Sequence, residues 1–123
     1  MTEAGDAGED DVESVLFDLL ADEYARTILV ATSREPMSAK TLSDRYDMSL
    51  PTVYRRVERL QEFDFLTEQT EIDTSGGHHR SVYEANLDHI DIDLENGDLA
   101  LEIRLREDAT DRFTRMWREM RGG

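Results

Sequence analysis

The chain contains no cysteine, two prolines and a single lysine among its 123 residues. The lack of cysteine excludes disulfides and thiolate-bound metal ions. No apolar run approaches the roughly 20 residues that a membrane-spanning helix needs. The first residues also lack the charged-then-apolar order of a signal peptide. These absences predict a cytoplasmic protein with no membrane partner.

Charge is strongly unbalanced, with 29 acidic residues against 14 basic ones and a net charge of −15. All basic residues except Lys40 are arginine. An acidic surface with almost no lysine suits a cytoplasm of molar salt, where charge repulsion is screened beyond about 3 Å. We therefore expect a salt-adapted protein. A disordered acidic chain is the alternative, and the regular apolar spacing described below argues against it.

The basic residues are concentrated in one part of the chain. Residues 34–60 hold six basic and four acidic residues, whereas the remainder holds eight basic and 25 acidic ones. A local cationic surface on an anionic body is the electrostatic pattern of a nucleic-acid-binding protein.

The first half of the chain shows helical periodicity. The acidic, glycine-containing residues 1–11 are expected to form a disordered tail. Apolar residues at helical spacing then predict helices over 11–20 and from Asp22 to about Ser33. Pro36 ends the second of these helices. Two further short helices are predicted, one capped by Ser38 and one by Ser49 that ends near residue 63, and they are joined by a turn at 47–48. Two short helices joined in this way indicate a helix-turn-helix, whose second helix enters the major groove of DNA.

Beyond Asp64 the apolar period changes to two, which is typical of strands. A first hairpin is predicted from residue 66 to residue 87, with a polar turn at 73–80. A second hairpin runs from residue 90 to residue 105 and turns at Asn96-Gly97, one of the strongest short-range hairpin signals. The last segment is predicted to be helical. The element order is helix, helix, helix-turn-helix, hairpin, hairpin, helix, which is an α+β fold.

Three stretches in this order resemble the winged helix-turn-helix transcription regulators, particularly the ArsR-like group. They are residues 19–29, the segment Ser49-Leu50-Pro51-Thr52-Val53-Tyr54-Arg55-Arg56-Val57, and Phe63-Asp64-Phe65-Leu66-Thr67-Glu68. The acidic surface resembles a version from an extreme halophile, of haloarchaeal type. The resemblance implies a winged-helix domain over 12–87, a recognition helix over about 49–63, a wing over about 65–87, and a homodimer on a palindromic site. Residues 88–123 would add a β-hairpin and a C-terminal dimerisation helix to the same compact unit.

The resemblance does not extend to metal sensing. The metal-sensing branch of that family binds its metal through cysteine thiolates on the recognition element, and this chain has none. We predict no metal site and no cofactor.

Residues expected at the DNA surface come from two places. The helix-turn-helix contributes Ser38, Lys40, Ser49, Pro51, Thr52, Tyr54, Arg55, Arg56 and Arg59. The tip of the first hairpin contributes His78, His79 and Arg80. Arginine is the commonest reader of guanine edges and also binds phosphate. Arg55 should point outward, Arg56 is expected to reach phosphate, and Arg59 either contacts DNA or serves only as an ion-pair partner.

Each of these residues also has a structural alternative. The arginines could form a solvated helix face paired with Glu58 and Glu62. Ser49 could act purely as a helix cap, and Tyr54 could be buried beside Val53. The adjacent histidines could lie in a solvated loop; they do not suit a metal ion, since neighbouring strand residues point to opposite faces.

The predicted terminal helices both carry apolar stripes. These comprise Val12, Val15, Leu16 and Leu19 at one end and Phe113, Met116, Trp117 and Met120 at the other. The stripes could pack on the domain's own core, or they could form the interface of a homodimer, which we favour for so small a domain.

The sequence shows no phosphate loop, catalytic triad spacing or paired metal ligands, so enzymatic activity is not expected. The prediction is a homodimeric, sequence-specific transcription regulator that binds double-stranded DNA. Two alternatives stay open: a winged-helix protein-interaction module, and a regulator gated by a small-molecule effector. The sequence does not indicate the operator, the target genes, the sign of regulation or the role of the second hairpin.

Overall fold

The computed structural model describes residues 7–73 and 78–107, and the surroundings of their side chains over 12–72 and 79–107. The elements are α1 (Ala7–Ala21), α2 (Glu23–Arg34), β1 (Met37–Ser38), α3 (Ala39–Tyr46), α4 (Leu50–Glu62), β2 (Leu66–Asp73), β3 (His78–Ala85), β4 (Leu87–Glu95) and β5 (Asp98–Leu105). The α+β fold class is confirmed, with helices followed by two hairpins. Helix α1 begins four residues before the predicted start, within the stretch predicted as a tail. The predicted C-terminal helix lies outside the described residues.

Side-chain caps and special backbone angles set the ends of the helices. Asp22 accepts a hydrogen bond from the backbone N–H of Ala25 at 3.0 Å and starts α2. Ser38 accepts one from Thr41 at 3.2 Å and starts α3. Asp47, in the left-handed region with φ of 58°, ends α3 and makes the turn to α4. An aspartate tolerates this conformation better than most residues, which explains the tight turn.

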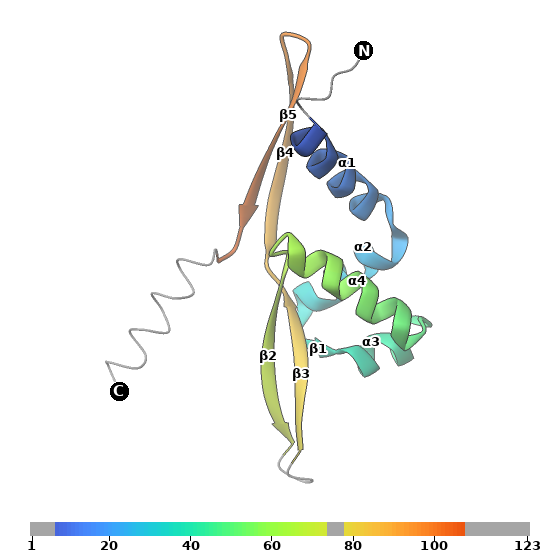
Figure 1. The fold of residues 1–123 in the computed structure, drawn as a ribbon. Helices are drawn as coiled ribbons and strands as arrows, with labels where there is room; N and C mark the ends of the chain where they lie inside the picture. Colours follow the sequence, from blue (N-terminus) through green and yellow to red (C-terminus); the bar gives the residue numbers. More distant parts are fainter. Residues whose placement is uncertain (1–6, 74–77, 108–123) are drawn as a thin grey trace, which may run out of the picture.

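The strands form two separate antiparallel sheets. The first sheet has the order β1-β3-β2, in which Met37 pairs with Tyr83 and Leu66 pairs with Ala85. The second is the β4–β5 hairpin. Figure 1 shows the β2–β3 wing and the β4–β5 hairpin projecting in opposite directions from the helices. The two-residue strand β1 was not predicted, because two residues are too few to show a period.

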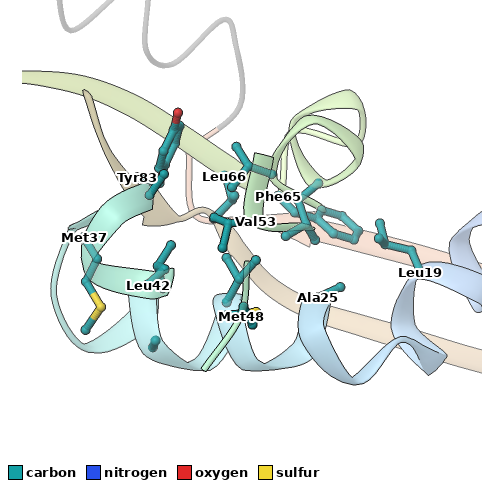
Figure 2. Packing of buried hydrophobic residues seen from close by; sticks show 14 of the residues in the cluster. Leu19, Ala25, Met37, Leu42, Met48, Val53, Phe65, Leu66 and Tyr83 are labelled. Atoms are coloured by element: carbon teal, nitrogen blue, oxygen red, sulfur yellow. The ribbon is translucent and has the colours of Figure 1, made fainter. Parts of the chain in front are cut away.

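The core lies where α1–α4 meet the inner ends of the strands. Its buried residues include Ile28 of α2, Leu42 of α3, Val53 and Leu60 of α4, and Phe65 just before β2. Figure 2 shows Val53, Phe65 and Leu66 close together among these helices. Packing of this face fixes α4 and the base of the wing relative to each other, so that the opposite face of α4 is turned to solvent.

Asn86 joins the two sheets. Its buried side chain donates to the backbone oxygens of Asp64 at 2.9 Å and Glu107 at 2.7 Å, and its Oδ1 accepts from the Glu107 N–H at 3.0 Å. Its backbone N–H donates to Phe65 and its carbonyl accepts from Arg106, both at 2.7 Å. The side chain and backbone of Asn86 therefore connect the α4–β2 turn, the start of β4 and the end of β5.

Candidate nucleic-acid interface

Helix α4 has one buried and one exposed face. Ser49 accepts from the backbone N–H of Thr52 at 3.2 Å, and Pro51 lies in the first turn, where its missing N–H leaves no hydrogen bond unmade. Val53, Val57 and Leu60 are buried at helical spacing. The predicted Ser49 cap is therefore present. Because the buried residues anchor one side of the helix, its opposite side forms an outward surface.

Tyr54 and Arg55 stand on that outward surface. The Tyr54 side chain is 54% exposed, which agrees with its predicted exposure. Arg55 is exposed, and among the described residues it makes no hydrogen bond or ion pair. Arg59 is also exposed and lies 3.6 Å from Glu62, its neighbour one turn later. The guanidinium of Arg55 is therefore the one on α4 that no described carboxylate holds.

Arg56 is directed into the protein rather than toward solvent. Its Nε and Nη2 both lie 2.9 Å from Oδ2 of Asp22, and its guanidinium lies over the ring of Tyr24, 5.6 Å from the centroid. The side chains of Arg56 and Asp22 are each only 25% exposed. This corrects the expectation that Arg56 reaches phosphate: two of its N–H groups already donate to one carboxylate oxygen, and an aromatic ring lies against its guanidinium within the fold.

Asp22 consequently has two roles, of which the sequence predicted only the first. It caps α2, and it holds α4 through Arg56. Burial pushes the pKa of Asp22 upward, but the Ala25 N–H and the Arg56 guanidinium outweigh burial, so its pKa lies below the ordinary value. The sequence identifies the cap because that contact is local. It carries no signal for a partner 34 residues away.

A groove separates α3, α4 and the wing. It encloses about 380 Å³ and is lined by Lys40, Tyr54, Arg80, Ser81 and Tyr83, together with the first residues of α3. Burial, Glu68 and Tyr54 raise the pKa of the Tyr83 hydroxyl, so Tyr83 stays neutral. The groove therefore brings together two predicted cations and one predicted aromatic residue that are distant in sequence.

The cations of this groove are paired at the surface. Lys40 lies 3.0 Å from Asp44, and Arg80 lies 2.8 Å from Glu71. All four side chains are at least half exposed. Exposed pairs of this kind are worth about 0–1 kcal/mol, so a phosphate could replace either carboxylate at little cost.

Two further residues of the predicted set have mixed outcomes. Ser38 is buried, and its hydroxyl caps α3, which corrects its assignment to the DNA surface. His79 is exposed at the start of β3. The side chain of His78 and the turn at 74–77 lie outside what is described.

The predicted dimer interface is only partly exposed. Leu16 and Leu19 are buried in the chain's own core, which corrects their assignment to an interface between copies. Val12 remains 57% exposed and Val15 is half-buried. Phe113, Met116, Trp117 and Met120 lie outside the described residues.

A second hollow encloses about 740 Å³ between α4, the wing and the end of β5. Its lining is mainly polar, with Gln61, Glu68 and Glu84 among its side chains. Small-molecule sites are mostly apolar with few polar groups. A small-molecule effector therefore stays a prediction without an assigned pocket.

No helix among the described residues is long and apolar enough to cross a membrane. The same residues contain no group of three or more histidine, aspartate or glutamate side chains that could hold a metal ion.

The comparison with family models addresses the segment that forms this surface. Residues 20–69 match the model described as a Helix-turn-helix domain. The protein contains a helix-turn-helix domain. The matched segment runs from the end of α1 through α2, α3 and α4 into β2, and so includes Asp22, Arg55 and Arg56. None of the curated proteins compared with the chain matches it.

Proposed function

We propose that the protein is a homodimeric, sequence-specific transcription regulator that binds double-stranded DNA. The observation that carries this proposal is the exposed, unpaired guanidinium of Arg55 on the outward face of α4. That face belongs to a helix-turn-helix domain, in which the second helix enters the major groove. In this arrangement Arg55 and Tyr54 face base edges, and Ser49, Pro51 and Thr52 approach the backbone at the helix start.

The groove beside α4 is the proposed binding site for the sugar–phosphate backbone that flanks the bases read by α4. Lys40 of α3, Tyr54 of α4 and Arg80 of the wing all line this groove. A sugar–phosphate strand lying along it would meet cations from α3 and from the wing. Phosphate contacts of this kind fix the register of the protein, whereas the residues of α4 supply specificity.

Charge distribution favours DNA over a protein partner on this face. Because the whole chain carries −15, most of its surface repels a polyanion. Against this background, Arg55 pairs with no described carboxylate, and the surface pairs of Lys40 and Arg80 are weak. The ArsR-like, haloarchaeal type and a cytoplasm of high salt are part of the same proposal, supported by the single lysine and the acidic excess.

The test is a DNA-binding titration. Binding sites are first selected from random duplexes, and fluorescence anisotropy then gives Kd at fixed salt. Arg55→Ala should weaken binding to the selected site by about 1–3 kcal/mol and relax the preferred base at one position. Arg104→Ala is the matched control: it removes the same charge from the β4–β5 hairpin, where Arg104 pairs with Asp91 at 3.4 Å.

The two variants separate the competing functions. Equal affinities of Arg55→Ala, Arg104→Ala and the parent chain would remove Arg55 from the interface. Failure of the selection to enrich any duplex would favour the protein-interaction module. Addition of cell metabolites that restores or abolishes binding would identify a ligand-gated regulator.

A further inference from the structure

The β4–β5 hairpin separates its side chains into two faces of opposite character. The register places Ile90 opposite Ile103, Ile92 opposite Leu101 and Leu94 opposite Leu99. Residues opposite one another share a face, so these six form one apolar face. The residues between them form the other face, which holds Asp91, Asp93, Glu95, Asp98 and Glu102.

Only the base of the apolar face has a partner among the described residues. Ile90 and Leu101 pack against the core, together with Leu87 and Leu105 at the start and end of the hairpin. Toward the tip, Ile92 is 55% exposed, Leu94 is 77% exposed and Leu99 is exposed as well. Ile103, opposite Ile90, is also exposed. A lone two-stranded hairpin is marginally stable in water, so such a face requires a cover.

We propose that residues 108–123 of a second copy cover this face, so that two copies exchange their C-terminal segments. This inference rests on the homodimer of the proposed function. The segment's sequence provides the complementary apolar stripe: Phe113, Met116, Trp117 and Met120 recur at helical spacing. Asn86 holds Glu107 at the base of the hairpin, so residues 108–123 follow directly from the same hairpin.

Charge favours a C-terminal segment on a hairpin over hairpin-to-hairpin or segment-to-segment contact between the two copies. Residues 87–105 hold six acidic residues and one arginine, whereas residues 112–121 hold four arginines and one glutamate. Two hairpins meeting face to face would bring like negative charges together, and two C-terminal segments would bring like positive charges together. A segment on a hairpin pairs opposite charges. Because neighbouring strands are only about 5 Å apart, arginines beside the stripe can reach the acidic side chains around the edges.

The exchange also accounts for the area that a stable dimer requires. A standard interface buries about 800 Å² on each partner. A phenylalanine and a tryptophan bury about 150–250 Å² each, and the two-fold axis repeats the contact. The apolar tip of each hairpin and each stripe are thereby both buried.

Trp117 provides a direct measurement, because it is the single tryptophan of the chain. Its emission in the full-length protein should be blue-shifted in the dimer and should move to longer wavelength on dilution, in step with dissociation measured by sedimentation. Leu94→Glu should raise the dimer Kd about tenfold or more and red-shift Trp117, since a carboxylate would enter the apolar contact. Ala100→Glu is the matched control, because residue 100 is exposed on the acidic face of the same hairpin.

The outcomes are distinct. A dimer in which Trp117 is solvent-exposed, or in which Leu94→Glu behaves like Ala100→Glu, overturns the exchange and leaves the homodimer intact. A blue-shifted Trp117 that does not respond to dilution as the dimer dissociates shows that the segment covers its own hairpin, which also overturns the exchange. A chain that is monomeric throughout overturns the homodimer, while the DNA titration of Arg55→Ala still tests DNA binding.

Engineered cysteine pairs test where the C-terminal segment binds, since the parent chain has no cysteine that could interfere. One copy carries Leu99→Cys and the other carries Met116→Cys, each with a different tag. The mixed pair should form a disulfide between chains, whereas Ala100→Cys with Met116→Cys should not. Equal crosslinking of both pairs would contradict the proposal.

Discussion

The helix-turn-helix and the β4–β5 hairpin differ in how they treat their apolar residues. The apolar residues of α4 that face inward, Val53, Val57 and Leu60, are all buried within the chain itself. Those of the hairpin are as regularly spaced, yet Ile92 and Leu94 are largely exposed. One region is therefore complete within the chain, whereas the other presents a prepared surface. A periodic pattern indicates that a face needs burial, but it does not indicate which molecule supplies the cover.

A leucine-to-alanine substitution made in each region should give the largest difference in the free energy of unfolding. Leu42→Ala removes a fully buried side chain from α3 and should lower the free energy of unfolding by about 2–5 kcal/mol. Leu94→Ala at the hairpin tip should change it by less than about 0.5 kcal/mol. Urea unfolding followed by circular dichroism, at a concentration where the chain is monomeric, measures both. Similar losses for the two variants would mean that the hairpin tip is packed like the core.

The junction between the two regions should be the next most sensitive point. Asn86→Ala removes the buried amide that donates to the part-buried carbonyl groups of Asp64 and Glu107, and should cost about 1–3 kcal/mol. Gln69→Ala is the control, because its exposed amide makes a single bond to Glu84, at 3.1 Å. If Asn86→Ala were as mild as Gln69→Ala, the junction would not couple the two sheets.

The ion pair beneath α4 should depend on pH. Asp22→Asn keeps a side-chain oxygen that can cap α2 but removes the charge that pairs with Arg56, and should cost about 1–2 kcal/mol at neutral pH. Because the pKa of Asp22 is lower in the folded state, its stabilisation is present above the unfolded value near 3.9 and is lost as pH falls through the folded value.

The difference between Asp22→Asn and the parent chain should therefore shrink in acid. Unfolding titrations at neutral pH and below about pH 3 measure it. Lys40→Met, which breaks an exposed pair, serves as the control and should change stability by less than about 1 kcal/mol at either pH. A constant difference for Asp22→Asn across this range would show that the charge of Asp22 does not contribute to stability through Arg56.

Local signals in the sequence predicted the elements well. Ser49, Pro51 and the Val53–Val57 spacing marked α4, and Asn96-Gly97 marked the second hairpin, whose turn residues have φ of 53° and 80°. Each of these signals acts within a few residues of chain. Physical preferences at that range, namely caps, fixed φ angles and apolar periods, are therefore sufficient to place helices and turns.

Contacts between distant residues were not predicted. The Asp22–Arg56 pair and the position of Asn86 depend on how finished elements dock, so no local spacing announces them. The same limit applies to the candidate site. Sequence reasoning placed Arg55 and Tyr54 on the outward face of α4, but it did not separate them from Arg56 and Ser38, whose side chains the fold uses for itself.

The smallest effect should be confined to the hairpin. Gly97 has φ of 80°, and a Cβ there would meet no atom within 4 Å, so Gly97→Ala adds backbone strain without a clash. The strain is about 1 kcal/mol. Because little of the hairpin packs on the core, this cost should speed amide exchange in β4 and β5 about fivefold and leave α4 unchanged. Asn96→Gly, which relaxes the neighbouring left-handed residue, is the control. Equal acceleration in α4 would show that the hairpin and the helix-turn-helix unfold as one unit, and the contrast between them would then be one of exposure alone.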